Sequence, residues 1–342
     1  MNRSLLKKLL IGLFLGGSLL LLGLFNASKP RILVLHSFAA DDPWVLELNK
    51  GIKTVLKGNR HPVTVKYHYI DVLKSEKSGG MAVAVNGARQ AISRLNPDVV
   101  IAVDDESNEL VARSYVGKTR HRIVFAATLQ TPESYGYAGA VNVSGIKEQL
   151  PLDAVRDTLL TARGGKPARI AVLGMQIPTC QAELTQVQSF NWAPHRLVAT
   201  QMANDFPTWQ RFTTRMADQA DVLLILSYGA LERGGGEKRE VSGTEMASWI
   251  EKNAKPLPIS IYPTYAENGG GLEISPAPAD FGKEGMQMAL KWVAARKGSA
   301  PPPITFSPHF RVGIRQSLLD ARGITMPPIY IEAARIGDDY FP

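Results

Sequence analysis

From residue 30 onward, short apolar segments alternate with longer segments whose apolar residues recur at helical spacing. The first apolar segment, 31–36, is bounded by Pro30 and by polar residues, which is typical of a buried strand. The next segment, 44–57, repeats apolar residues on one helical face and ends at Gly58, a residue that favours helix termination. This alternation predicts parallel sheets covered by helices on both faces, because parallel strands are joined by crossover helices.

The alternation starts again near residue 151, so the sequence predicts an α/β protein with two doubly wound parallel-sheet lobes. The expected strands are 31–36, 63–70, 98–103, 122–126, 168–173, 195–202, 221–226, 257–261 and 305–314. The expected helices are 44–57, 82–95, 106–116, 151–162, 180–190, 207–219, 243–253, 280–296 and 317–322. No repeat of solenoid length and no low-complexity segment interrupts the pattern.

The N-terminal segment 1–29 differs from the rest of the chain in charge and hydropathy. Residues 1–8 are basic, and 9–25 form a charge-free run rich in Leu, Gly and Phe. This order is typical of a signal peptide, and an uncleaved run of this kind also fits an N-terminal membrane anchor. Both alternatives stay open. Either one places the folded part in the periplasm, anchored to the inner membrane if the segment is not cleaved.

The charge balance argues against a nucleic-acid partner. The net charge is +8, but four basic residues and no acidic residue lie within 1–29. The remainder has no run of Lys and Arg of the kind that follows a phosphate backbone. We therefore expect a protein that does not bind nucleic acid.

The motifs of the common enzyme classes are absent from the sequence. It has no nucleophile elbow, no HExxH, no Gly-rich phosphate loop and no CxxC pair. The histidines show no metal-ligand spacing, and the glycine triplets 234–236 and 269–271 lack dinucleotide-binding spacing. The single cysteine, Cys180, cannot form an internal disulfide bond. We expect a binding protein rather than an enzyme, with no catalytic residue, metal or cofactor.

The fold class predicts where a ligand binds. In open parallel sheets, ligands lie beyond the carboxyl ends of the strands, where loops lead into helix N-termini. The corresponding loops here are 37–44, 104–107, 127–130, 174–179, 227–230 and 262–271. The candidate ligand-binding residues are Ser37, Phe38, Asp41, Trp44, Asp104, Asp105, Glu106, Thr128, Asn142, Gln176, Tyr228 and Tyr265.

Two of these loops are acidic, and their carboxylates have two alternative roles. Asp41 and Asp42 follow the first expected strand, whereas Asp104, Asp105 and Glu106 follow the third. They can recognise an ammonium group, another cation or sugar hydroxyls, or they can cap the helices that begin beside them. The aromatic candidates can stack on a ligand or belong to the core; they are Phe38, Trp44, Tyr228 and Tyr265.

Several short motifs together resemble one protein family. They are Ile32-Leu-Val-Leu-His-Ser37, Pro43-Trp44, Asn49-Lys-Gly-Ile52, Asn96-Pro-Asp-Val-Val-Ile-Ala-Val103, Arg122-Ile-Val-Phe125, Val141-Asn-Val-Ser-Gly145, the helix 282–298 and Gly323-Ile-Thr-Met-Pro327. In this order and spacing, they resemble the ABC transporter substrate-binding protein family that includes tryptophan- and tyrosine-type binders. They are equally similar to related periplasmic sensing domains. The resemblance covers roughly residues 31–335.

The resemblance implies a type I periplasmic binding fold, in which two α/β lobes are joined by three crossovers and close on a small ligand. The crossovers are then expected near 142–145, 271–275 and 301–304. The implied division is 1–29 as signal or anchor, 30–144 plus 275–301 as lobe 1, and 145–274 plus 302–342 as lobe 2. The helix 280–297 would return to lobe 1 and the tail to lobe 2.

The implied function is an extracytoplasmic solute-binding protein that delivers its ligand to an ABC permease. The alternative is a membrane-anchored periplasmic ligand sensor that acts through a separate signalling protein. The chain departs from the family pattern where Asp104-Asp105-Glu106 replaces a small Gly/Thr/Pro loop that holds a ligand carboxylate, and where 129–132 replaces an acidic motif. Because acidic residues beside a site disfavour anions, we expect a polar or cationic small-molecule ligand.

Overall fold

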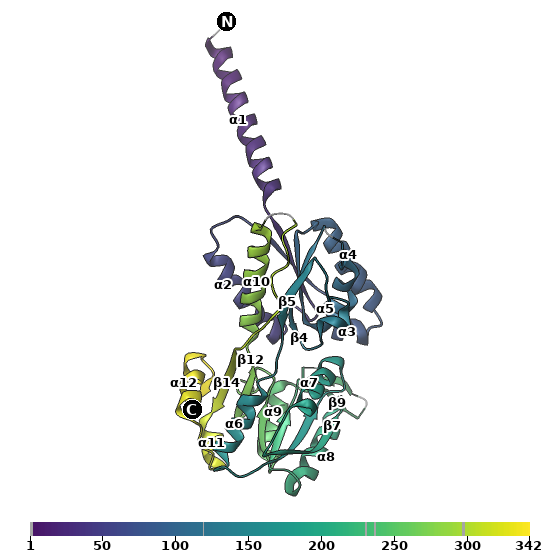
Figure 1. The fold of residues 1–342 in the computed structure, drawn as a ribbon, viewed down its shortest axis with the longest axis vertical. Coiled ribbons are helices and arrows are strands. Elements are labelled where there is room, and N and C mark those ends of the chain that lie inside the picture. The colour runs from purple at the N-terminus through teal and green to yellow at the C-terminus, as the bar shows by residue number, and fades with distance from the viewer. Residues whose placement is uncertain (1–2, 119, 230, 236, 296–297) are drawn as a thin grey trace.

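The computed structural model describes residues 3–118, 120–229, 231–235, 237–295 and 298–342. It consists of two lobes, each built around one mainly parallel sheet, and helix α1 (Arg3–Ser28) extends away from the first lobe (Figure 1). The two α/β lobes and the three connections between them confirm the predicted fold class.

The sheet of the first lobe is parallel throughout, with strand order β13-β5-β4-β3-β1-β2. Its strands are β1 (Arg31–His36), β2 (Thr64–Tyr69), β3 (Val99–Val103), β4 (Arg122–Thr128), β5 (Val143–Lys147) and β13 (Thr305–Phe306). Its helices are α2 (Pro43–Gly58), α3 (Val72–Lys77), α4 (Met81–Leu95), α5 (Asp104–Leu110) and α10 (Pro278–Ala294), with the short 3-10 helices η1 (Ala112–Tyr115) and η2 (Pro132–Tyr135).

Helices cover both faces of this sheet, as the continuous apolar strands predict. Side chains of a strand point alternately to its two faces. Ile32 and Val34 of β1 therefore pack with α2 and α10, whereas Leu33 and Leu35 pack with α4.

The sheet of the second lobe has strand order β15-β14-β12-β11-β8-β6-β7, with one antiparallel pair, β12 with β14. Its strands are β6 (Arg169–Gly174), β7 (Arg196–Met202), β8 (Val222–Ile225), β11 (Leu257–Ser260), β12 (Leu272–Pro276), β14 (Phe310–Arg315) and β15 (Tyr340–Phe341). Its helices are α6 (Leu152–Ala162), α7 (Pro178–Ser189), α8 (Phe206–Arg215), η3 (Met216–Asp218), α9 (Gly243–Asn253), α11 (Gln316–Ala321) and α12 (Pro328–Ile336). A hairpin of β9 (Glu232–Gly234) and β10 (Glu237–Glu240) follows β8.

The chain crosses between the lobes three times, a few residues later than expected. It leaves the first sheet after β5, returns between β12 and α10, and leaves again after β13. The predicted crossovers at 142–145 and 271–275 overlap β5 and β12, whose residues pair within their own sheets. Boundaries placed after 144 and 274 therefore fall inside these strands, and the boundary after 301 falls before β13.

The predicted strand 305–314 is in fact two strands in different sheets. β13 pairs with β5 of the first lobe, whereas β14 pairs with β12 of the second. Pro308 lies between them, and proline has no backbone N–H with which to continue a ladder. The third crossover therefore lies at this break rather than at 301–304. The short elements α3, β9, β10, α12 and β15 were also not predicted.

Helix α10 returns to the first lobe, as expected, and packs against α2 at close range. A Cβ atom added to Gly51 would lie 1.8 Å from the carbonyl oxygen of Ala279, and one added to Gly282 would lie 2.0 Å from that of Leu48. No side chain fits at such distances. Glycine at these two positions therefore allows α10 to lie on the first lobe between two crossovers.

Helix α1 covers most of the basic N-terminal segment and the charge-free run. Many large apolar side chains along it are exposed: Leu10, Ile11, Leu13, Phe14, Leu15, Leu19, Leu20, Leu21, Leu22, Leu24 and Phe25. Within the part of the chain that the structure describes, no helix has both the length and the apolarity needed to cross a membrane. The membrane anchor is thus not confirmed.

Candidate ligand-binding site

A pocket lies between the two lobes, beyond the carboxyl ends of strands from both sheets. About 690 Å³ of space lies between its wall atoms, and part of this space is open solvent. The first lobe and its crossover contribute Phe38, Asp42, Trp44, Leu73, Asp104, Asp105, Ala127, Leu129 and Glu148. The second lobe contributes Ile177, Thr179, Glu183, Ser227, Gly229, Ile261, Tyr262, Pro263 and Pro276.

Asp104 is the first residue after β3 and begins α5. Its φ of +66° lies in the left-handed region, which aspartate adopts more readily than most residues. Trp44 Nε1–H donates a hydrogen bond to Asp104 Oδ1 at 2.8 Å, whereas Oδ2 has no partner among the described residues. Burial, with repulsion from Glu106 and Glu148, raises the pKa of Asp104 well above its usual range.

Two other first-lobe carboxylates accept several hydrogen bonds from the lobe itself. Asp105 accepts from two backbone N–H groups of the loop after β4, at 3.1 and 3.3 Å, and from the Tyr135 hydroxyl. Asp42 caps α2 by accepting from two backbone N–H groups of its first turn, at 2.9 and 3.4 Å. These acids hold loops and helix ends in place, so the capping role applies to Asp42.

Polar and apolar contacts join the lobes around the pocket. Thr179 Oγ1, at the start of α7, donates a hydrogen bond to Glu106 Oε1 of α5 at 2.9 Å. Lys77 of α3 forms an ion pair with Glu240 of β10. Leu129, which follows β4, packs into the apolar core of the second lobe. The two lobes are therefore closed against each other in this structure.

Two further carboxylates line the pocket, one from the second lobe and one from the first crossover. Glu183 of α7 accepts hydrogen bonds from the Ser227 backbone N–H at 3.0 Å and from Ser227 Oγ at 2.5 Å. Despite these bonds, complete burial raises the pKa of Glu183 to about 7. Glu148, at the first crossover, is also buried. Burial, with repulsion from Glu183 and Asp105, raises the pKa of Glu148 well above its usual range.

Aromatic rings form much of the apolar wall. Trp44 packs against Phe281 of α10, with ring centroids 6.2 Å apart. Tyr262 meets Tyr228 edge to face, with centroids 5.0 Å apart. Phe38 lies in the same wall. Such rings can pack on the apolar part of a ligand and can attract a cation to their faces.

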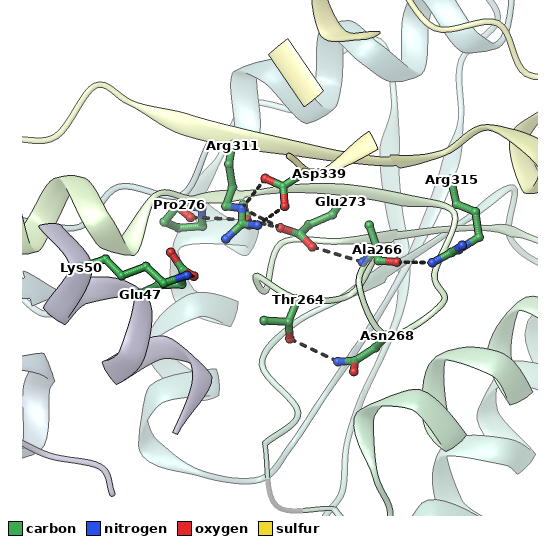
Figure 2. A network of polar contacts seen from close by, with 11 residues as sticks. Glu47, Lys50, Thr264, Ala266, Asn268, Glu273, Pro276, Arg311, Arg315 and Asp339 are labelled. Carbon is green, nitrogen blue, oxygen red and sulfur yellow. Dashed lines mark hydrogen bonds and ion pairs between the residues drawn. The ribbon is translucent and has the colours of Figure 1, made fainter. Parts of the chain in front are cut away.

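A polar network in the second lobe holds the loop between β11 and β12, which carries Tyr262 (Figure 2). Arg311 of β14 pairs with Asp339 and, at 3.5 Å, with the buried carboxylate of Glu273. Glu273 Oε2 also accepts a hydrogen bond from the Ala266 backbone N–H at 3.2 Å. In this network the chain itself supplies the cation that a buried carboxylate needs.

The structure brings only part of the predicted site together. The predicted residues that line the pocket are Phe38, Trp44, Asp104 and Asp105. The predicted residues that lie outside its wall are Ser37, Asp41, Glu106, Thr128, Asn142, Gln176, Tyr228 and Tyr265. The strand-end rule selects loops, but it does not determine which side chains of a loop point toward the space between the lobes.

Several of these outlying residues have structural roles. The Ser37 hydroxyl donates to β3 and accepts from a backbone N–H of α5, both at 2.9 Å. The Asn142 side-chain amide donates to backbone carbonyl groups between 115 and 121. The Tyr265 hydroxyl donates to Glu251 at 3.0 Å, within the second-lobe core. Their polar groups are therefore engaged within a lobe.

Sequence reasoning missed most of the polar residues on the second-lobe side. The predicted strand-end loops 174–179, 227–230 and 262–271 do contain three of these residues, namely Thr179, Ser227 and Tyr262. The loop positions therefore gave a usable signal for them. Glu183 lies within α7, and Glu148 follows β5, which was not predicted as a strand. No sequence signal marked these two carboxylates.

The wall is acidic and has no basic counterpart. Its described residues include five carboxylates and no Lys, Arg or His. Among the residues that the structure describes, no group of three His, Cys, Asp or Glu side chains is arranged to hold a metal ion. The pocket can therefore pair with an organic cation, through carboxylates and aromatic rings.

No protein-family model matches the sequence, and no curated protein matches it. Solved structures do match. The ABC domain from Streptococcus pneumonia in complex with L-Trp superposes with a TM-score of 0.66 at 15% identity, covering 90% of this chain and 98% of that chain. A ligand-free, open substrate binding protein with adhesive properties from Clostridium difficile has a TM-score of 0.63 at 13% identity, covering 87% and 96%. The chain has the type I periplasmic binding fold.

Proteins with the type I periplasmic binding fold also include sensor components. A chain of the TorS sensor domain–TorT complex superposes with a TM-score of 0.52 at 13% identity, covering 88% of this chain and 97% of that chain. The fold therefore agrees with the resemblance seen in the order of the sequence motifs. These three structures are of binding or sensor proteins.

Proposed function

We propose that this protein is an extracytoplasmic solute-binding protein that closes its two lobes on a small cationic ligand. The observation that carries the proposal is the charge of the interlobe pocket, whose described wall has five carboxylates and no basic side chain. Removing carboxylates from water without a cationic partner is unfavourable. A ligand that brings positive charge therefore stabilises the closed pocket.

Binding and closure are coupled through a shift in population. A ligand that touches both lobes binds the closed form better than the open form and moves the equilibrium toward closure. The hydrogen bond from Thr179 to Glu106 and the ion pair of Lys77 with Glu240 join the lobes in this structure. A cation between the lobes adds attraction to these contacts.

A zwitterion such as tryptophan fits this pocket less well than a cation does. The carboxylate of an amino acid needs hydrogen-bond donors or positive charge, whereas α5 presents Asp104 and Asp105 at its start. The rings of Phe38, Trp44 and Tyr262 favour a ligand that combines a cationic group with an apolar body. We therefore place the ligand among organic cations.

We favour a transport function, in which the protein delivers its ligand to an ABC permease, because the similar structures include an ABC domain and a substrate binding protein. A second function has support of its own. The TorS–TorT complex contains the same fold, and α1 of this chain exposes many apolar side chains. That alternative is a periplasmic sensor held at the inner membrane by its N-terminal segment and coupled to a separate signalling protein.

Thermal unfolding of the full-length chain in mild detergent, against amines, amino acids, sugars and carboxylates, tests the ligand class. A ligand that binds only the folded state stabilises it by about 2.7 kcal/mol at a hundred times its Kd. We expect organic cations to raise the unfolding midpoint and carboxylates to leave it unchanged. A midpoint raised by anions alone, or by no solute, would contradict the proposal.

Fractionation of cells that express the full-length chain distinguishes the transport function from the sensor function. A shortened form in the soluble periplasmic fraction is the result that transport predicts. Retention of the full-length protein with the inner membrane is the result that the sensor predicts.

A further inference from the structure

The five carboxylates of the pocket differ in how the protein satisfies them. Three accept at least two hydrogen bonds each from the protein: Asp42, Asp105 and Glu183. The other two do not. Asp104 accepts one hydrogen bond at Oδ1, and its Oδ2 has no partner. For the carboxylate of Glu148, the described part of the chain provides no hydrogen-bond donor.

Both of these residues are largely buried. Asp104 and Glu148 are each only 6% exposed. An ionised carboxylate that is buried without a partner is strongly unfavourable, whereas one paired with a cation and hydrogen-bonded to it is tolerated. In the closed pocket, the ionised form of each carboxylate is therefore favoured only when a positive group pairs with it.

The two carboxylates approach the pocket from different parts of the molecule. Asp104 begins α5 of the first lobe, whereas Glu148 opens the first crossover beside Glu183 of the second lobe. They are close enough to repel each other, because Glu148 contributes to the raised pKa of Asp104. When both are ionised they carry two negative charges, and a cation with a single charge neutralises only one of them.

Elsewhere the chain supplies a cation of its own to a buried acid. Glu273 is 1% exposed and pairs with Arg311 (Figure 2). Among the described residues of the pocket wall, there is no Lys, Arg or His that could form such an ion pair with Asp104 or Glu148. A positive partner for their ionised forms is therefore expected to come with the ligand.

We propose that the ligand is a small organic dication whose two cationic groups pair with Asp104 and Glu148 and whose apolar stem packs between the aromatic rings. This inference rests on the proposed function and specifies its ligand class. Phe38, Trp44 and Tyr262 supply the apolar wall for the stem. An inorganic dication is disfavoured, because no metal-binding group of three side chains occurs among the described residues.

Titration calorimetry on the full-length chain tests the number of charges. The probes are the diamines putrescine and cadaverine, compared with butylamine and pentylamine, which have the same carbon skeletons and one amine fewer. A second charge-assisted contact is expected to make each diamine bind roughly ten- to a hundredfold tighter than its monoamine. This ratio of affinities is the quantity to follow in the variants.

Two variants remove one charge each without changing side-chain size. Asp104→Asn keeps a residue type that tolerates the left-handed backbone, and Glu148→Gln keeps the length of the side chain. Each is expected to bring the ratio of diamine to monoamine affinity close to one. Glu109→Gln removes an exposed acid of the same helix, α5, and is expected to leave the ratio unchanged. Circular dichroism and the unfolding midpoint confirm that every variant is folded.

The outcomes separate this inference from the proposed function. Equal binding of diamines and monoamines, or a ratio that neither Asp104→Asn nor Glu148→Gln lowers, overturns the dication while leaving a cation-binding protein. Binding of a neutral solute but of no amine overturns the dication and the cation, and keeps a solute-binding protein. Binding of no solute in the wider panel contradicts both.

Discussion

At the scale of single residues, the acids of the pocket are distinguished by the donors that surround them. The sequence places Asp104 and Asp105 side by side after an apolar strand and gives no reason to separate them. In the fold, the loop after β4 donates two backbone hydrogen bonds to Asp105, whereas Asp104 turns into the pocket with one oxygen unpaired. That division depends on a distant loop, so neighbouring residues in the sequence cannot reveal it.

The raised pKa of Glu183 makes stability depend on pH. We predict that Glu183 makes the ligand-free protein progressively less stable, relative to Glu183→Gln, as the pH rises from about 5 to about 8. Burial raises the folded-state pKa of Glu183 from 4.5 to about 7, so the folded state keeps a proton that the unfolded state has released. The stabilising contribution is complete below pH 4.5 and disappears as the pH rises through 7. Its size is on the order of 3 kcal/mol in the free energy of unfolding.

Urea unfolding at several pH values measures this dependence, and Glu183→Gln is its matched control. The variant is expected to lose the part of the pH dependence that comes from this side chain. The remainder includes contributions from other buried acids whose pKa is raised, among them Asp104, Asp105, Glu148 and Glu273. It also includes His36, whose pKa burial lowers from 6.5 to about 4, so that His36 acts in the opposite direction below pH 6.5. A difference in stability between the natural protein and Glu183→Gln that stays constant over this pH range would contradict the buried state of Glu183.

At the scale of elements, most strands and helices follow from the sequence because their apolar periodicity is strong. The predicted helix 243–253 coincides with α9, and the strand 31–36 coincides with β1. Elements were misplaced where the family pattern assigned a strand to a crossover, or where one apolar run contains two strands. β5 and β12 were assigned to crossovers, and the run 305–314 conceals the exchange of sheets at Pro308. Short edge elements such as β9 and β10 are set by tertiary contacts.

The close approach of α2 and α10 gives a prediction at this scale. Gly282→Ala is expected to lower the free energy of unfolding by about 1–3 kcal/mol or more, because a methyl group there collides with backbone. The added Cβ would lie 2.0 Å from the Leu48 carbonyl oxygen. Urea unfolding of the variant measures the loss.

Gly58→Ala is the control, since Gly58 lies at the end of α2, the helix that α10 packs against, with no atom within 4 Å of an added Cβ. It is expected to leave stability unchanged or to raise it by up to about 1 kcal/mol, through helix propensity. Equal stability of Gly282→Ala and the natural protein would show that the two helices do not need their close approach.

At the scale of the whole molecule, the sequence predicts the two lobes and the place of the site between them. Of the acidic residues in the pocket wall, it predicts those of the first lobe but not Glu183 or Glu148. The first-lobe acids follow strand ends directly, so the sequence reveals them. The second-lobe side depends on how α7 and the first crossover face the cleft once the lobes close, and this placed Glu183 and Glu148 in the wall. Closure on a cation is thus a property of both lobes together.

The distance between the lobes, measured by fluorescence energy transfer, tests closure on a cation most directly. Dyes on Val83→Cys in α4 and Thr244→Cys in α9 report on exposed positions of the two lobes, and the native Cys180 is buried. We predict that the amine that binds most tightly raises the transfer efficiency, and that Asp104→Asn reduces this response. An amine that binds without changing the efficiency, or an equal response to an anionic solute, would contradict closure on a cationic ligand.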